Sequence, residues 1–147
     1  MDYILTEDTI LLYPKVSEKG ITTVVFEKNR IIEIMKSPKR IIKYNCLKYG
    51  STFEGRRKHS KRLINVSSKT PIIVRESKEL IMFPVQSDRN YNCCWINLSN
   101  HDLIEWRNED NFVIKSKSEQ LMNLNVSYNI MTNQIKNGAL LYYTYFK

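Results

Sequence analysis

Short apolar runs separated by polar turns dominate the first third of the chain. Four of these runs form two pairs: Tyr3–Thr6 and Thr9–Tyr13 flank Glu7-Asp8, and Ile21–Phe26 and Arg30–Met35 flank residues 27–29. β-branched and aromatic side chains, such as those of Val24, Val25 and Phe26, favour strands over helices. The pattern therefore predicts a small antiparallel meander that contains two hairpins.

A helix is predicted over Pro38–Tyr49. Ser37 is a good N-cap residue, proline is tolerated at the first helical position, and Gly50 suits the position after the helix. The apolar residues that share one face of this helix are Ile42, Cys46 and Tyr49. The cations on the other side are Lys39, Arg40 and Lys43. Beyond Gly50 we expect a loop or a second short helix.

The second half of the chain alternates between apolar runs and turn signals. The predicted strands are Leu63–Val66, a hairpin of Pro71–Val74 and Leu80–Phe83 closed by Pro84, then Trp95–Leu98, and a meander of Ile104–Trp106, Phe112–Lys115 and Leu121–Val126. A polar loop is expected at Ser87–Tyr91.

Ser127 is predicted to cap a final helix over Tyr128–Tyr143. Its expected inner stripe is Ile130, Gln134, Ile135 and Ala139. The aromatic end, Leu140–Phe146, is expected to be buried against the domain or a second subunit. Together these elements predict one α+β domain over residues 1–147, mainly antiparallel, with a basic helix–loop segment and a C-terminal helix.

Composition agrees with a folded domain. The chain has 147 residues, of which 42% are hydrophobic and 26% charged, which argues against disorder. No apolar run is long enough for a membrane span, and the acidic start Met1-Asp2-Tyr3 argues against a secretory signal. An odd number of cysteines, two of them adjacent, favours reduced thiols in a cytoplasmic protein.

The net charge of +8 is concentrated in one segment. Lys36–Arg62 contains ten basic residues and one acid, Glu54, for a local charge of +9, so the rest of the chain sums to −1. A solvated basic face without a partner is one interpretation. Nucleic acid is the favoured partner, and a membrane surface is disfavoured because no broad apolar face lies beside the cations.

Catalytic and metal-binding alternatives find little support. The four glycines are too widely spaced for a phosphate-binding loop. Zinc could in principle be held by Cys46, Cys93, Cys94, His59 and His101, and a thiol nucleophile could be formed by one of these cysteines with a histidine. The sequence around these residues contains no local motif for either site. Glu76-Ser77-Lys78 matches an E-x-K fragment of metal-dependent nucleases, but it lies in a predicted turn. The clustered carboxylates that such an enzyme needs to hold a divalent ion are missing from the sequence around it. A helix–turn–helix over residues 38–62 is possible, but the segment after Phe53 has little of the apolar periodicity expected for its second helix.

Aromatic residues lie among the cations at Tyr44, Tyr49 and Phe53. They could stack on unpaired bases or pack the helix onto a sheet. Packing is favoured for Tyr49, and both interpretations stay open for Tyr44 and Phe53.

Several ordered motifs resemble the ComK family of competence transcription factors. The motifs are Asn45–Arg57 (NCLKYGSTFEGRR), Ser67–Ile72 (SSKTPI), Phe83–Arg89 (FPVQSDR), Trp95-Ile96, and Val126–Asn129 (VSYN) followed by Gln134. They cover nearly the whole chain, although Thr70-Pro71 stands where the family usually has two prolines. Many members continue into a longer C-terminal tail, so the sequence is identified as a short member.

The resemblance implies a non-enzymatic, cofactor-free activator of DNA-uptake genes in the cytoplasm, associated with the nucleoid. It implies recognition of paired AT-rich boxes in double-stranded DNA, mainly through the minor groove, by dimers that pair up on the DNA. It also implies control by an adaptor of the Clp protease system. The alternative is a non-catalytic regulatory paralogue that associates with a full-length activator.

The basic segment suits such a role, because the narrow minor groove of A-tracts attracts inserted Arg and Lys. Gly55 is expected to permit close approach, with Arg56 or Arg57 entering the groove. The residues expected to hold phosphates are Lys39, Arg40, Lys43, Lys61 and Arg62. Lys48 and Lys58 complete the predicted DNA-binding surface.

Overall fold

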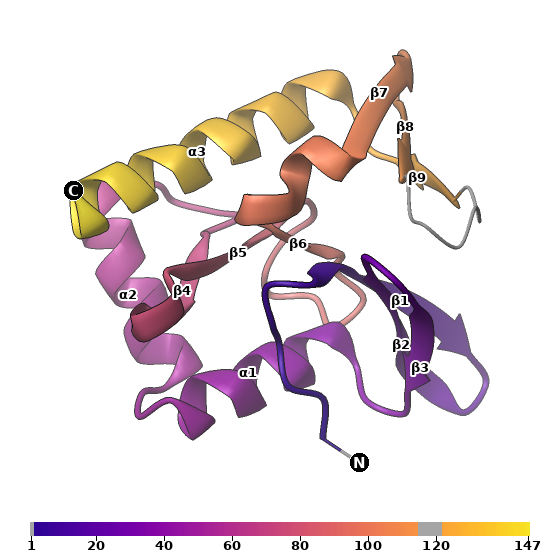
Figure 1. Cartoon of the computed structure of the whole chain (residues 1–147), viewed down its shortest axis with the longest axis horizontal. Coiled ribbons are helices and arrows are strands. Elements are labelled where there is room, and N and C mark those ends of the chain that lie inside the picture. The colour runs from indigo at the N-terminus through magenta and orange to yellow at the C-terminus, as the bar shows by residue number, and fades with distance from the viewer. Residues whose placement is uncertain (1, 115–121) are drawn as a thin grey trace.

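A computed structural model describes residues 2–114 and 122–147 (Figure 1). Within these residues the strands form a six-stranded sheet, in the order β3-β2-β1-β6-β5-β4, and a three-stranded sheet, in the order β7-β8-β9. Every pair of neighbouring strands is antiparallel. With three α-helices in the described residues, the predicted α+β class is confirmed.

The first three strands form the expected meander with one change. β1 (Thr9–Ser17) pairs with β2 (Gly20–Glu27), and β2 pairs with β3 (Ile31–Ile34) around the predicted turn. The predicted hairpin around Glu7-Asp8 is wrong, because residues 2–8 contain no strand. The first hairpin instead turns between Ser17 and Gly20.

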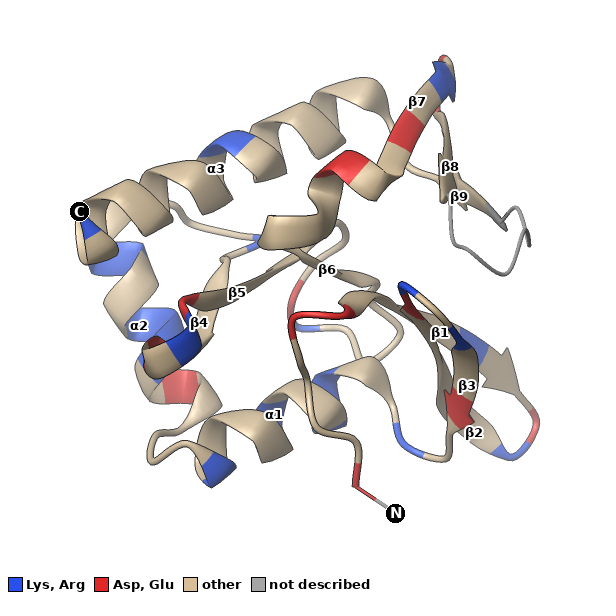
Figure 2. Ribbon diagram, viewed as in Figure 1, with Lys and Arg blue, Asp and Glu red and all other residues tan. Residues whose placement is uncertain are grey.

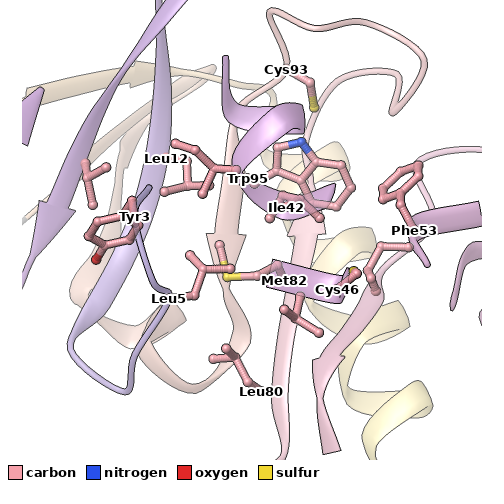
Figure 3. Close-up of a cluster of buried hydrophobic side chains, with 14 of the residues drawn as sticks. Tyr3, Leu5, Leu12, Ile42, Cys46, Phe53, Leu80, Met82, Cys93 and Trp95 are labelled. Carbon is pink, nitrogen blue, oxygen red and sulfur yellow. The ribbon is translucent and has the colours of Figure 1, made fainter. Parts of the chain in front are cut away.

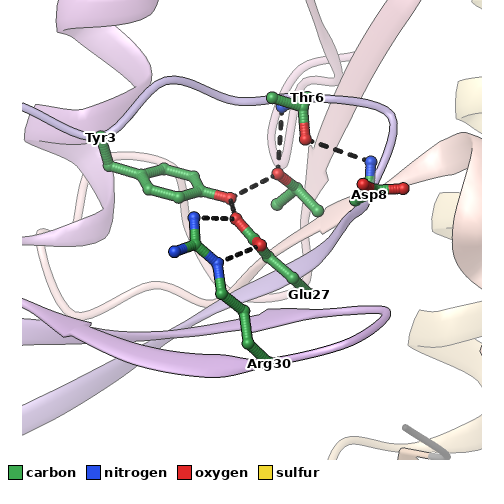
Figure 4. A network of polar contacts seen from close by, with 6 residues as sticks. Tyr3, Thr6, Asp8, Glu27 and Arg30 are labelled. Atoms are coloured by element: carbon green, nitrogen blue, oxygen red, sulfur yellow. Dashed lines mark hydrogen bonds and ion pairs between the residues drawn. The ribbon is translucent and has the colours of Figure 1, made fainter. Parts of the chain in front are cut away.

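Side chains hold the N-terminal segment in place of a strand partner. The Asn45 amide accepts the Leu5 N–H (3.0 Å) and donates to the Tyr3 carbonyl (2.9 Å). The Tyr3 hydroxyl donates to the Glu27 carboxylate, which also binds Arg30 at 2.6 Å (Figure 4). Burial raises the pKa of Glu27, but the bonds from Arg30 and Tyr3 outweigh it and hold that pKa below its ordinary value.

Two consecutive helices follow the meander. α1 (Pro38–Lys48) begins as predicted, with the Ser37 hydroxyl accepting from the Arg40 N–H, and Gly50 has a positive φ of 83° just beyond its end. The region after Gly50 is a full helix, α2 (Phe53–Ile64), capped by Thr52.

The predicted strand at Leu63–Val66 is wrong, because its first two residues are the last turn of α2. The helix ends where Asn65 adopts the left-handed conformation. The buried face of α2 consists of Phe53, Arg56, Ser60 and Ile64. Two of these four residues are polar, so a hydrophobicity pattern misses the helical spacing.

β4 (Ile72–Arg75), β5 (Leu80–Pro84) and β6 (Trp95–Asn97) complete the large sheet, and β4 and β5 form the predicted hairpin. Both faces of this sheet are covered, so successive residues enter different clusters. Trp95 packs with residues of α1 such as Cys46 (Figure 3). Ile96, on the opposite face, packs with residues on the side of the C-terminal helix. α1 thus lies on one face and the C-terminal helix on the other (Figure 1).

The small sheet and the last helix were predicted with nearly correct bounds. The strands of the small sheet are β7 (Ile104–Asn108), β8 (Asn111–Ile114) and β9 (Met122–Asn125). The predicted strand ends Lys115 and Leu121 lie outside the described residues. α3 (Tyr128–Phe146) starts at the predicted cap, with the Ser127 hydroxyl accepting from the Ile130 N–H.

The inner stripe of α3 confirms the prediction at Gln134, whereas Ile130 and Ile135 are half-buried against the core and the other buried positions differ. Its buried residues are Met131, Gln134, Gly138 and Leu141. Gly138 lies against Leu98, and a Cβ at this position would lie 2.9 Å from Cδ1 of Leu98, so that side chain would have to move. Gln134 is buried because its amide donates to the carbonyls of Lys69 and Pro84, both at 2.7 Å. The aromatic end is partly covered: Leu141 is buried, but Leu140 and Tyr143 are exposed.

Candidate nucleic-acid interface

The basic segment Lys36–Arg62 folds into α1, α2 and the turn between them (Figure 2). We call the solvent-facing side of these two helices the outer face, and the side that contacts the rest of the molecule the inner face. Cations are found on both faces, and their environments differ sharply.

Five cations of the outer face form no ion pair with a carboxylate of the described residues. Within the described residues, none of five cations on the two helices forms an ion pair: Arg40, Lys48, Lys58, Lys61 and Arg62. All are exposed except Lys61, which is half-buried. Their charges are therefore available to an external anion.

Lys39 and Lys43, on α1, are half-buried beside an aromatic ring. The ammonium groups lie 5.2 Å and 5.6 Å from the centroid of Tyr91, and Lys39 also lies 5.4 Å from Phe53. Cations in this position interact favourably with the ring electrons. Sequence reasoning had no signal for Tyr91, because it lies 48 residues after Lys43 in a polar loop.

Arg56 lies on the inner face. It is 8% exposed, and its Nη1 is 2.6 Å from Oε1 of Glu76, in the 3-10 helix that joins β4 to β5. This hydrogen bond, together with one from Tyr145 at the end of α3, keeps the pKa of Glu76 below its usual value. Arg56 thus links α2 to two other parts of the fold.

Arg57 is also committed to a carboxylate. Its Nε lies 2.8 Å from Oδ2 of Asp88, which is 2% exposed, in the loop between β5 and β6. The hydrogen bond that Arg57 donates to Asp88 raises the pKa of the guanidinium. Asp88 belongs to the FPVQSDR motif, but nothing in the sequence pairs it with Arg57.

Gly55 occupies the first turn of α2, beside the helix cap. Its N–H donates to the Thr52 hydroxyl at 3.0 Å, and a Cβ at this position would lie 2.9 Å from that oxygen. Gly55 is thus part of the capped first turn of α2.

The three aromatic residues of the segment have different surroundings. Phe53 is buried and meets Trp95 edge-on, with the ring centroids 6.1 Å apart (Figure 3). Tyr49 is half-buried beneath Arg75, whose guanidinium carbon lies 4.5 Å from its ring centroid. Tyr44 lies beneath Lys36 at 5.8 Å. The structure therefore places Phe53 in the core and leaves Tyr44 and Tyr49 at its edge.

The cysteines are enclosed by the core. Cys46, Cys93 and Cys94 are buried and form no disulfide, and burial raises the pKa of Cys46 and of Cys93 to about 12. A thiol with such a pKa is a poor nucleophile at neutral pH. No group of three His, Cys, Asp or Glu residues within residues 2–114 and 122–147 is arranged to hold a metal ion. None of the described helices has both the length and the apolarity needed to cross a membrane.

Fold and surface together define an α+β protein with five cations on two consecutive helices that form no ion pair among the described residues, an arrangement suited to a polyanion. The chain belongs to the ComK family, since the family model described as ComK protein matches residues 1–147. It is 26% identical over 139 residues to the Competence transcription factor of Bacillus subtilis (strain 168). That alignment covers 95% of this chain and 72% of the relative. No solved structure matches the chain.

Proposed function

We propose that this protein is a competence transcription regulator that binds double-stranded DNA through the outer face of α1 and α2. The observation that carries the proposal is the group of five cations on these helices that form no ion pair within the described residues. Such cations displace counterions from phosphates and give salt-dependent affinity. Family membership and the name of the Bacillus relative support the regulatory role.

The proposed target is a pair of AT-rich boxes, contacted mainly through the minor groove. A-tracts concentrate negative potential in a narrow groove, which suits exposed arginines such as Arg40 and Arg62. Two boxes bound by paired dimers would raise specificity, because single AT-rich boxes are abundant competitors. Activation of DNA-uptake genes in the cytoplasm, and control by a Clp adaptor, follow from the family resemblance and stay predictions.

The complete proposed DNA surface keeps the ten predicted residues but divides their roles. Those assigned to phosphates or groove edges are Lys39, Arg40, Lys43, Lys48, Lys58, Lys61 and Arg62. Arg56 and Arg57 would have to leave Glu76 and Asp88 before entering a groove. We therefore assign these two arginines, with Gly55, to positioning α2.

Fluorescence anisotropy with a labelled AT-rich duplex tests this proposal, with a G·C-rich duplex of equal length as the reference. The variant Arg40→Ala/Lys58→Ala/Arg62→Ala removes three outer-face cations. The matched control Arg107→Ala/Lys136→Ala/Lys147→Ala removes three cations from β7 and α3. We expect the first variant alone to lose affinity, with its salt slope reduced by about one for each phosphate contact removed.

Equal affinity of the two triple variants would overturn the assigned surface. Absence of DNA binding by the wild-type protein at low salt would overturn the function itself. Competition by a small minor-groove ligand tests the groove, since a protein in the major groove would stay bound.

A regulatory paralogue is the second candidate function. The side chains of Leu140 and Tyr143 are exposed on α3, and apolar residues at the surface can contact another protein. Co-purification with a full-length activator, together with no DNA affinity of the protein alone, would favour this candidate. Leu140→Ala/Tyr143→Ala should then abolish the association.

A further inference from the structure

We propose that the Ser87–Tyr91 loop is a second DNA-contacting element and that the Tyr91 ring contacts a base step or sugar in the groove. The inference rests on the proposed DNA binding and adds a residue outside the basic segment. This loop joins β5 to β6 and lies beside α1 and α2 through contacts of Tyr91 and Asp88.

Hydrogen bonds at its base make the loop a defined structure. The Val85 N–H donates to the Cys94 carbonyl at 3.1 Å, and the Cys94 N–H donates to the Gln86 side chain at 2.8 Å. The Asn90 N–H closes a turn by donating to the Ser87 carbonyl at 3.1 Å. The loop therefore leaves the sheet from a fixed base.

A buried ion pair attaches the loop to α2. Asp88, 2% exposed, binds Arg57, and this bond prevents the loop from moving away from the helix without exposing or isolating a carboxylate. The ion pair between Arg57 and Asp88 thus holds in place a loop whose tip is exposed to solvent. Such bracing fits a loop that presents a side chain to a partner.

Tyr91 is the side chain that the loop presents. It is 44% exposed, and the cations of Lys39 and Lys43 lie on it at 5.2 Å and 5.6 Å. Tyr91 also lines an open groove with Arg40 and with Lys19–Thr22 of the β1–β2 hairpin. An exposed aromatic ring surrounded by cations, at the edge of a groove, combines an apolar surface with phosphate-binding charge.

Duplex DNA is the occupant that fits this chemistry. Minor-groove proteins insert apolar side chains at flexible base steps, while neighbouring cations hold the phosphates on either side. Lys39, Lys43 and Arg40 are positioned for the second task, and Tyr91 for the first. Arg89, exposed in the same loop, adds a further cation.

Tyr91→Ala and Tyr91→Phe test the ring contact, with Tyr128→Ala on α3 as the control for loss of an exposed tyrosine. Binding to the AT-rich duplex is measured by anisotropy, and its bending by energy transfer between dyes at the two DNA ends. We expect Tyr91→Ala to weaken binding roughly tenfold and to reduce the bend, with little change in salt slope because no charge is removed. Tyr91→Phe should retain both properties.

Wild-type binding combined with equal affinity of Tyr91→Ala and Tyr128→Ala would overturn the loop contact while the proposed function stands. Equal loss in Tyr91→Ala and Tyr91→Phe would also contradict a contact made by the ring. Failure of the wild-type protein to bind DNA would instead reject the proposed function. Circular dichroism of each variant verifies that the fold is intact.

Discussion

The inner and outer faces of the same basic segment use their cations in opposite ways. On the inner face, Arg56 and Arg57 are bound to carboxylates from distant parts of the chain. On the outer face, Arg40, Lys58 and Arg62 are exposed and form no ion pair within the described residues. The net charge of a segment can therefore locate a surface, but it does not show which of its cations are available to a ligand.

Substitutions on the two faces should therefore have separable effects. Loss of an inner-face arginine should lower the free energy of unfolding, whereas loss of an outer-face cation should lower DNA affinity. The ion pair of Arg57 offers the sharpest contrast, because its partner is the more deeply buried carboxylate.

Arg57→Ala should cause the largest loss of stability in this set. It leaves Asp88 with its charge in a buried site, and breaking such a pair costs about 3 kcal/mol. Urea unfolding of wild type and variant measures the difference. Arg57→Ala/Asp88→Ala should lose less than the sum of the two single variants, and strict additivity would show that the pair has no coupling energy.

Arg56→Ala should have a smaller effect, of about 2 kcal/mol. The arginine is buried, but Glu76 is half-exposed, so water can solvate the carboxylate that is left behind. Glu76→Gln keeps the shape of the partner and should destabilise the fold less than Arg56→Ala. The reverse order in urea unfolding would contradict the assigned roles of burial and charge.

The same contact predicts a dependence of stability on pH. Because Arg56 holds the pKa of Glu76 below its ordinary value of 4.5, the contact stabilises the fold above that value. Its contribution should be lost as the pH falls below about 4.5 toward the lowered pKa of the folded state. Arg56→Met should therefore show a shallower loss of stability with acid than wild type. Parallel pH curves for the two proteins would argue against this linkage.

The sequence was sufficient for most elements but not for the contacts of the basic segment. Caps and turn residues such as Ser37, Gly50 and Ser127 located α1 and α3, because these signals are local. The sequence pattern does not distinguish a loop from a helix for α2, because Arg56 and Ser60 occupy its buried face. Partners such as Glu76 and Asp88 lie 20 and 31 residues from their arginines, so no periodicity reveals them.

The candidate surface was predictable in location and not in detail. Ten basic residues within Lys36–Arg62 are visible in the sequence, and so is the family resemblance. Tyr91 carries no such signal, because its position beside Lys39 arises from the packing of the β5–β6 loop against α1. Residues brought together by tertiary packing need the structure.

The smallest expected change in stability comes from substituting Arg40, an outer-face cation at the start of α1. Lys39 and Arg40 lie in the first turn, which contains no acidic residue, although the positive end of the helix dipole disfavours cations there. Arg40→Glu removes this conflict and completes a capping box with Ser37, because the acid stands three residues after the cap. The variant should be more stable by about 0.5 kcal/mol and should bind DNA more weakly.

Thermal unfolding and anisotropy of Arg40→Glu measure these opposite changes, and Arg40→Gln separates capping from charge reversal. Both variants can cap, so both should gain stability, but Arg40→Glu should lose more affinity because it repels phosphate. A cation kept at a position where it weakens the helix is explained by a ligand that needs it. Lower stability in both variants would mean that Arg40 supports the fold, and the contrast between the two faces would then fail at α1.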